Sequence, residues 1–471
     1  MTSRPFFAWR APDLEGSGSS RSGRDPVRVV YEDFDRTQWL APDELTAMVL
    51  ARVRALLGHA AREVPYYRRL FEEHGIVPDD VRSMHDFRRL PLLERRLVQE
   101  RFGELQARSL PAHMVATGTV FTSGSSGVPV RISQTNVGDL VWFAAYLRDL
   151  EWTEADPRGS LASIRYVNAE GEVRARLLEG VSAPTWEPRL HRLIETGPSF
   201  AMDIHQDPRR QLEWLYRITP DYLVSYPSNL EFLAGLIEES GRPLPGLKII
   251  KSLSESLSAE TLARVEAAFG VPVKNTYSCM EAGYLASPCP EGHGLHVHAE
   301  NVLLEVLDDA GEPCPPGKAG RVVLTALHNF RMPLVRYEIM DEAAFSLERC
   351  PCGRGLPLLD RPIGKRHPLF RLPDGRSKNT IGLAVAMRKI GGTHQFRVVQ
   401  RAIDRVLVRV VPDRNFNAEH ERRIRDAMRD FFESAVHVTV ETTERLELTA
   451  SGKSPHLVSE LENESGSRAP T

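Results

Sequence analysis

A loop rich in serine and glycine occupies residues 122–129, directly after an apolar, strand-like run at residues 114–121. Glycine lets the backbone bend and approach a ligand closely, and hydroxyl and backbone N–H groups can hold phosphate oxygens. The loop is not a Walker A motif, because no Gly-Lys-Ser/Thr sequence closes it. On its own it fits either a plain connecting loop or a phosphate-binding loop, and in the second case the candidate contacts are Thr122, Ser123, Gly124, Ser125, Ser126 and Gly127.

Cysteines and histidines form a second set of residues that could do chemistry. Cys289 is followed closely by His293 and His296, and Cys350 and Cys352 come in a later segment. Thiolates and an imidazole at this spacing are typical ligands of a tetrahedral structural zinc ion. The sequence therefore predicts a Cys₃His zinc site, with either histidine as the fourth ligand.

The composition is that of an ordinary globular protein. The chain has 471 residues, of which 42% are hydrophobic and 26% charged, and its formal net charge is −3. This balance provides no field that would attract nucleic acid or an acidic membrane. No apolar run approaches the ~18–20 residues of a membrane span, and the N-terminus lacks a signal pattern. We expect a cytoplasmic protein.

The hydrophobic pattern indicates an α/β fold. A helix is expected over residues 42–75, and strand-like and helical stretches then alternate from about 110 to 300, which favours a mostly parallel sheet. Ligands collect at the carboxyl ends of such strands. Short strands follow, including one at residues 343–346, and they indicate an antiparallel part. The last ~100 residues are expected to form a small α+β domain.

Five motifs stand in order along the chain, at residues 122–129, 252–256, 277–281, 333–341 and 449–453. Their order resembles the AMP-forming adenylating superfamily of acyl-CoA synthetases. Within it, the chain is most similar to the phenylacetate–CoA ligase-like branch. Further marks of that branch are Val-Pro-Tyr-Tyr-Arg at 64–68, Leu-Pro-Leu at 90–92 and Cys-Pro-Cys-Gly-Arg at 350–354.

The resemblance implies a domain organisation. It consists of a large N-terminal adenylation domain at residues 27–363, with parallel sheets and an antiparallel, zinc-binding subdomain at about 287–360, and a small mobile α+β C-terminal lid domain at 364–459. Disordered tails are expected at 1–26 and 460–471.

The resemblance also implies roles for individual residues. Ser254, Glu255 and Ser256 would pack on adenine, as would Tyr277 with its neighbour Ser278. Glu281 would coordinate Mg²⁺, and Asp341 and Arg336 would lie at the ribose. Lys453 would stabilise the charge that builds on the α-phosphate. In relatives of this branch that carry zinc, a strand begins near position 295, so we prefer His296 over His293 as the fourth ligand.

The implied activity is the ATP-dependent adenylation of a carboxylic acid, either aryl or arylacetic, and transfer of the acyl group to coenzyme A. The implied cofactors are ATP, Mg²⁺ and structural Zn²⁺, and the implied partner is a small-molecule acid. Whether the chain forms a homodimer is left open. The chain has Val128 and Met280 where the superfamily usually has Lys and Thr, and residues 364–368 lack its acidic hinge. Two alternatives therefore remain. One keeps adenylation but uses an amine, or activates nitrite; the other is a non-catalytic nucleotide-binding relative.

Overall fold

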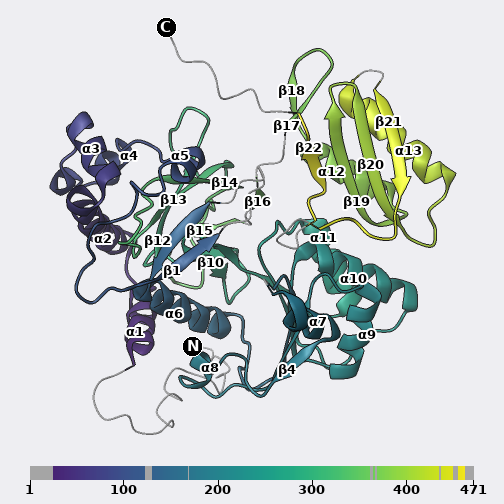
Figure 1. The fold of residues 1–471 in the computed structure, drawn as a ribbon, viewed down its shortest axis with the longest axis horizontal. Coiled ribbons are helices and arrows are strands. Elements are labelled where there is room, and N and C mark those ends of the chain that lie inside the picture. The colour runs from purple at the N-terminus through teal and green to yellow at the C-terminus, as the bar shows by residue number, and fades with distance from the viewer. Residues whose placement is uncertain are drawn as a thin grey trace.

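The computed structural model describes residues 25–121, 130–167, 169–360, 364–365, 369–433, 436–448 and 454–461. The chain forms three parts, and the first, called here the N-terminal part, is built from residues both before and after the α/β layer (Figure 1). Helices and antiparallel sheets make up one part, an α/β layer with a parallel sheet makes up the second, and the C-terminal residues form a small unit beside the α/β layer. None of the helices in these described ranges combines the length and apolar character needed to cross a membrane.

The N-terminal part begins with helices that cover the antiparallel sheets. They are α1 (Pro26–Thr37), α2 (Pro42–Glu63), α3 (Pro65–His74), the 3₁₀ turn at Pro78–Asp80, α4 (Met84–Arg88) and α5 (Arg95–Glu100). The single helix expected over residues 42–75 is wrong, because Val64 is extended (φ −105°, ψ 112°) and separates α2 from α3. Proline disfavours the α conformation of the residue before it but fits the first turn of a new helix. Pro65 therefore ends one helix and starts the next.

The α/β layer contains a six-stranded sheet in the order β4-β5-β3-β6-β7-β8. All neighbouring strands are parallel except β4 and β5. The strands are β3 (Leu161–Arg165), β4 (Val181–Ala183), β5 (Ser199–Asp203), β6 (Tyr222–Ser225), β7 (Ile249–Ser252) and β8 (Val273–Asn275). Its helices are α6 (Asn136–Trp152), α7 (Gly171–Glu179), α8 (Pro188–His191), α9 (Pro208–Ile218), α10 (Pro227–Ser240) and α11 (Ala259–Phe269). Helix α10 is buried along most of its length, as its apolar sequence requires.

Antiparallel strands make up the sheets of the N-terminal part. One sheet has the order β15-β11-β10-β9, a second has the order β12-β13-β14-β16, and β1 and β2 form a hairpin. The strands are β1 (Ala116–Phe121), β2 (Arg131–Thr135), β9 (Tyr277–Cys279), β10 (Gly283–Pro288), β11 (Leu295–Val297), β12 (Val302–Leu307), β13 (Gly320–Ala326), β14 (Tyr337–Ala343), β15 (Leu358–Leu359) and β16 (Gly364–Lys365). The strand expected at residues 343–346 is wrong, because β14 ends at Ala343 and Phe345 makes only an isolated bridge to Leu359.

The C-terminal unit has a core of its own, formed by residues such as Phe370, Val398 and Ile424. Its four-stranded sheet has the order β21-β20-β19-β22. The elements are β17 (Leu369–Arg371), β18 (Ser377–Asn379), α12 (Ile381–Ile390), β19 (Thr393–Ala402), β20 (Arg405–Pro412), α13 (Ala418–Phe432), β21 (His437–Thr442) and β22 (Leu457–Ser459). The fold class expected from the sequence, α/β with an antiparallel part and a small α+β C-terminal part, is confirmed.

Candidate functional site

Two of the predicted site residues meet across two different sheets. Tyr277 begins β9 and Asp341 lies in β14, and the Tyr277 hydroxyl donates a hydrogen bond of 2.8 Å to Asp341 Oδ2. Tyr277 is buried, and its burial, together with the negative charge of Asp341, raises the pKa of its hydroxyl. The hydroxyl therefore stays protonated and holds the carboxylate in place.

Glu281 lies just after β9, on the same side of the molecule. Its carboxylate is 9% exposed, and its Oε1 atom is 4.0 Å from an Arg95 guanidinium nitrogen at the start of α5. Burial raises the pKa of Glu281, the arginine opposes this rise, and the charge of Asp341 adds to it. Two carboxylates close enough to influence each other, in a partly dehydrated setting, form a donor set that a hard cation would stabilise.

The predicted phosphate loop, with Thr122, Ser123, Gly124, Ser125, Ser126 and Gly127, lies outside the described residues. The hairpin that carries it is described, since Phe121 pairs with Arg131 at its inner end. The Gln134 side chain of β2 donates to the carbonyl oxygen of Met280 over 3.5 Å. The hairpin thus contacts the turn that carries Glu281.

The segment with Ser254, Glu255 and Ser256 follows β7 at the carboxyl edge of the parallel sheet. Ser254 has a left-handed backbone (φ +67°), which is rare for a residue with a side chain and is enriched at functional sites. The Glu255 carboxylate accepts two backbone N–H groups, from Ser228 at 2.9 Å and Ser454 at 3.3 Å. Its side chain is thus directed toward the C-terminal unit, while contact of this segment with adenine stays a prediction.

Arg336 occupies a different setting from the one the motif suggests. It is 4% exposed, and its Nε atom donates to Glu305 over 3.0 Å. Its two terminal nitrogens also donate within the protein, to Glu305 and to the carbonyl oxygens of Arg88 and Leu90. The guanidinium therefore connects the chain just before β14 to β12 and to the backbone of residues 88–90. Its expected place at the ribose stays a prediction. Ser278 pairs with Tyr284 between β9 and β10. Lys453 lies outside the described residues, one position before Ser454.

Three aromatic side chains, called here the aromatic wall, lie beside the turn that carries Glu281. Two of them, Trp142 and Tyr146, were not predicted as site residues from the sequence motifs. Trp142 and Tyr146 of α6 are stacked with ring centroids 5.4 Å apart, and Tyr284 meets Trp142 edge-on at 5.8 Å. Trp142 is 41% exposed although it is large and apolar, and it lies against Gly283, where a Cβ atom would come within 3.3 Å of the indole. The spacing of four residues between Trp142 and Tyr146 could have indicated from the sequence that the two rings share one helix face.

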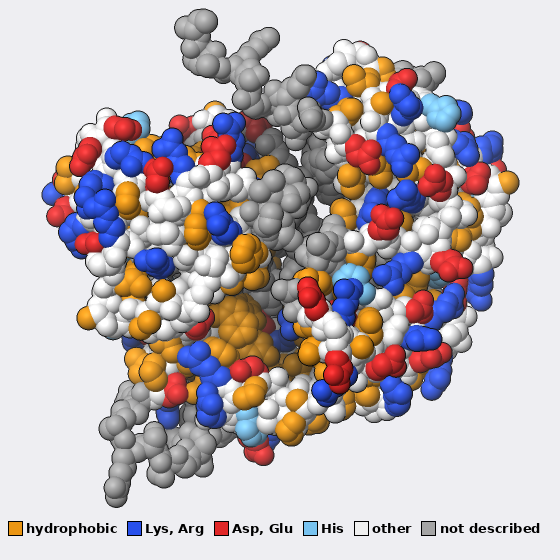
Figure 2. Space-filling model, viewed as in Figure 1, with side chains coloured by type: hydrophobic (Ala, Val, Ile, Leu, Met, Phe, Trp, Pro, Cys, Tyr) orange, Lys and Arg blue, Asp and Glu red, His pale blue; other side chains and the backbone are white. Residues whose placement is uncertain are grey.

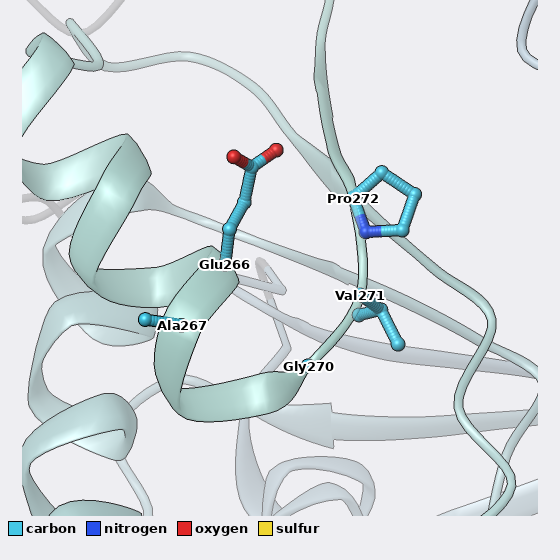
Figure 3. A pocket seen from close by; sticks show the side chains of 5 residues that line it. All are labelled: Glu266, Ala267, Gly270, Val271 and Pro272. Carbon is cyan, nitrogen blue, oxygen red and sulfur yellow. The ribbon is translucent and has the colours of Figure 1, made fainter.

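The molecular surface is hollowed between the N-terminal part and the α/β layer, and hydrophobic side chains gather in the hollow (Figure 2). A different, shallow hollow lies at the end of α11, lined by Glu266, Ala267, Gly270, Val271 and Pro272 (Figure 3). None of the predicted site residues lines that second hollow.

Cys289, His296, Cys350 and Cys352 form a buried cluster whose potential ligand atoms all lie within 4.8 Å of one another. The sulfur atoms of Cys289 and Cys350 are 3.4 Å apart, and His296 Nε2 is 3.2 Å from the sulfur of Cys352. Three thiols and one imidazole are the donor types that closed tetrahedral zinc sites use.

The orientation of His296 fits the role of a metal ligand. Its Nδ1 atom lies 3.3 Å from the carbonyl oxygen of Leu356, which leaves Nε2 for the sulfur side of the ring. Burial lowers the pKa of His296 to about 4, so the imidazole is neutral at pH 7. His293 is instead 43% exposed and lies 3.9 Å from Glu291. The geometry therefore favours His296 over His293.

Comparison with known sequences finds relatives that are named as CoA ligases. Residues 372–460 match a family model described as the CapK C-terminal domain. The phenylacetate–coenzyme A ligase of Thermus thermophilus is 27% identical over 67% of this chain and 69% of its own length. The enzyme of the same name from Escherichia coli is 23% identical over 66% of this chain and 70% of its own length.

Comparison with solved structures gives the same fold. A 2-hydroxyisobutyryl-CoA ligase in its post-adenylation state, bound to 2-HIB-AMP, has a TM-score of 0.70 at 20% identity and covers 90% of this chain and 92% of its own. The same ligase in its thioesterification state, with 2-HIB-AMP and CoA, has a TM-score of only 0.56 over 90% and 91%. An anthranilate CoA ligase bound to anthranoyl-AMP has a TM-score of 0.52 at 14% identity over 94% and 97%.

Proposed function

This chain is a homologue of the phenylacetate–coenzyme A ligases and has the fold of the adenylating CoA ligases, and we propose that it is an AMP-forming acid–thiol ligase. In the proposed reaction a carboxylate attacks the α-phosphate of ATP, pyrophosphate leaves, and an acyl adenylate forms. The thiol of coenzyme A then attacks the acyl carbonyl, a thioester forms and AMP leaves. The homologues and the structural neighbours that carry this activity in their names support the enzyme class.

The observation that carries the proposal is the hydrogen bond between Tyr277 and Asp341. These residues come from two motifs that are far apart in sequence, and Glu281 lies beside them. In the proposed site, Tyr277 presents its ring to the adenine and fixes Asp341 at the ribose. Glu281 would hold Mg²⁺, which would neutralise part of the charge of the phosphates that the loop at residues 122–127 binds. Lys453 stabilises the charge that develops on the α-phosphate.

We propose that the acyl group of the substrate binds against the aromatic wall formed by Trp142, Tyr146 and Tyr284. An exposed stacked indole next to a glycine provides a flat apolar face, on which an aryl ring can pack edge-on or offset. The wall continues into the Glu281 turn through Gly283, so an acid held there has its carboxylate near the phosphates. This assignment favours aryl or arylacetic acids, as the names of the homologues also suggest.

We further propose that Cys289, His296, Cys350 and Cys352 bind one structural zinc ion. All four residues are buried, and the set provides four ligands and no open position, which is the pattern of structural rather than catalytic zinc. The ion would join β11 to the segment before β15 and so stabilise the antiparallel sheet that ends in β9. The proposed reaction uses ATP and coenzyme A, which fits a cytoplasmic enzyme.

The decisive experiment measures pyrophosphate release with a panel of carboxylic acids, with and without Mg²⁺ and with and without coenzyme A. We expect aryl and arylacetic acids to give Mg²⁺-dependent release and, when coenzyme A is present, an acyl-CoA product identified by mass spectrometry. Adenylate that is trapped only by an amine, or turnover with nitrite, would move the activity to the alternative acceptors. ATP binding without pyrophosphate release from any acid would contradict the proposal and favour a non-catalytic relative.

A further inference from the structure

The C-terminal unit contacts the α/β layer mainly through β19 and α10 (Figure 1). His394 at the start of β19 lies 3.1 Å from Glu239 and packs its ring against Phe232. The neighbouring Gln395 side chain donates to the carbonyl oxygen of Ser228 over 3.0 Å. These contacts run along α10, and the one at Ser228 lies at its N-terminal end, which is also the helix end that faces Glu255.

Glu255 connects the two parts of the molecule through one carboxylate. Oε2 accepts the N–H of Ser228 in the first turn of α10 at 2.9 Å. Oε1 accepts the N–H of Ser454 at 3.3 Å. The partial positive charge of the helix N-terminus attracts the negative charge of a carboxylate, and hydrogen bonds to a charged acceptor are stronger than neutral ones. Ser454 is the residue directly after Lys453.

The segment that begins at Ser454 is held from its other side by the C-terminal unit. Arg397 of β19 donates through Nε to the carbonyl oxygen of Pro455 over 3.0 Å, and its Nη2 donates to the carbonyl oxygen of Glu447 over 2.6 Å. Strand β22 then runs parallel to β19. A second carboxylate of the α/β layer faces this segment, because Glu231 of α10 lies 3.8 Å from His456.

We propose that Glu255 is a positioning residue that docks the lysine-bearing segment for adenylation. This inference rests on the proposed function. Removal of its negative charge would release the backbone at Ser454 and so misplace Lys453, the residue directly before it in the chain. The domain arrangement supports a role in the first half-reaction, because the chain superposes better on the post-adenylation state of 2-hydroxyisobutyryl-CoA ligase than on its thioesterification state.

The proposal predicts that the two half-reactions respond differently to Glu255→Gln. The glutamine keeps the length of the side chain but can accept through only one atom, so one of the two N–H groups loses its partner. ATP–pyrophosphate exchange, with the best acid found in the screen, should fall about 10- to 100-fold, as expected for loss of a charged hydrogen-bonding partner. Acyl-CoA formation from purified acyl adenylate and coenzyme A should stay within about twofold of wild type.

Glu266→Gln is the matched control. Glu266 is also half-buried, and its carboxylate also accepts a backbone N–H, from Val273 at 2.9 Å, but both partners lie within the α/β layer. This variant should leave both half-reactions unchanged. Hydrogen exchange provides a second readout, because the peptide covering residues 454–461 should exchange faster in Glu255→Gln and at the wild-type rate in Glu266→Gln.

The outcomes separate this inference from the proposed function. If the wild-type protein exchanges pyrophosphate and Glu255→Gln does so at the same rate, only the positioning role is overturned. Equal loss of both half-reactions, with a lower melting temperature, would give Glu255 a purely structural role and would overturn the inference as well. A wild-type protein that exchanges pyrophosphate with no acid would overturn the proposed function and this role with it.

Discussion

The Cys/His cluster and the Tyr277–Asp341–Glu281 site differ in whether their polar side chains face only one another or leave charge for a ligand. In the cluster, four ligand atoms face one another within 4.8 Å and are all buried, so the site is closed. In the other site, a buried tyrosine fixes one carboxylate while a second carboxylate lies 4.0 Å from an arginine and within reach of Asp341's charge. The first arrangement suits an ion that stabilises the fold, and the second leaves negative charge for a ligand to neutralise.

Replacement of Lys453 should have the largest effect on the reactive side of this comparison. Lys453→Ala should lower pyrophosphate release about 1,000-fold, because its ammonium acts on charge that develops only in the transition state. ATP affinity, measured by calorimetry, should stay nearly unchanged. Lys318→Ala is the control, since Lys318 is exposed and, like Lys453, follows a glycine in the sequence. Wild-type release by Lys453→Ala would remove this lysine from the mechanism.

Glu281→Gln should lower the Mg²⁺-dependent rate about 100-fold, because an amide oxygen binds a hard cation more weakly than a carboxylate does. The pKa of Glu281 is raised by burial, so protonation of the wild-type carboxylate as the pH falls should give the rate an acid limb, and the variant should lack it. Glu338→Gln is the control, because that carboxylate pairs with Arg321 at 3.0 Å and is also largely buried. An unchanged rate and Mg²⁺ dependence in Glu281→Gln would exclude Glu281 as the ligand.

Cys352→Ser tests the closed side of the comparison. It should remove most of the zinc and lower the melting temperature by roughly 10 °C, because structural zinc contributes folding free energy directly. The chemistry of the remaining folded enzyme should change little. Cys314→Ser is the control, since Cys314 lies in a turn outside the cluster. Full zinc content in Cys352→Ser, or no zinc in the purified wild-type protein, would contradict the assignment. Zinc lost from His293→Ala but kept in His296→Ala would move the fourth ligand.

Trp142→Ala should have the smallest effect and should sharpen the substrate assignment. Loss of the stacked indole should raise KM for aryl acids about tenfold and leave KM for short aliphatic acids nearly unchanged. The ratio of kcat/KM values for the two classes of acid is the measurement. Trp186→Ala is the control, because Trp186 packs on Tyr222, away from the Glu281 turn. An equal change for both classes of acid would mean that Trp142 does not line the acyl pocket.

The sequence carried enough information for features that depend on local pattern. Alternating strands and helices predicted the parallel sheet, and Cys289, His296, Cys350 and Cys352 could be grouped because few residue types bind zinc. Pro65 also indicated the helix break, but apolar residues recur at helical spacing on both sides of it, so a single helix was predicted. Tyr277 and Asp341 could each be placed by motif, although their mutual hydrogen bond could not.

Other features depend on partners that no local pattern identifies. Arg336 matches a nucleotide motif, but its guanidinium pairs with Glu305 and supports the backbone of residues 88–90. Glu255 lies in the motif expected at adenine, but its carboxylate reaches Ser454, which is almost two hundred residues further along the chain. Such contacts are set by how the parts pack together, so the sequence indicates the residue type and leaves its partner open.

The anchoring of the chain on both sides of residues 449–453 limits where Lys453 can go. Leu446 is buried in the core of the α/β layer, Leu448 packs against that core, and Ser454 is held by Glu255. Consecutive Cα atoms are about 3.8 Å apart, so the lysine backbone must stay within about 4 Å of the Ser454 anchor. In the proposed reaction, Lys453 would thus be a tethered cation, at an effective concentration on the order of millimolar or above, and none would have to be recruited from solution.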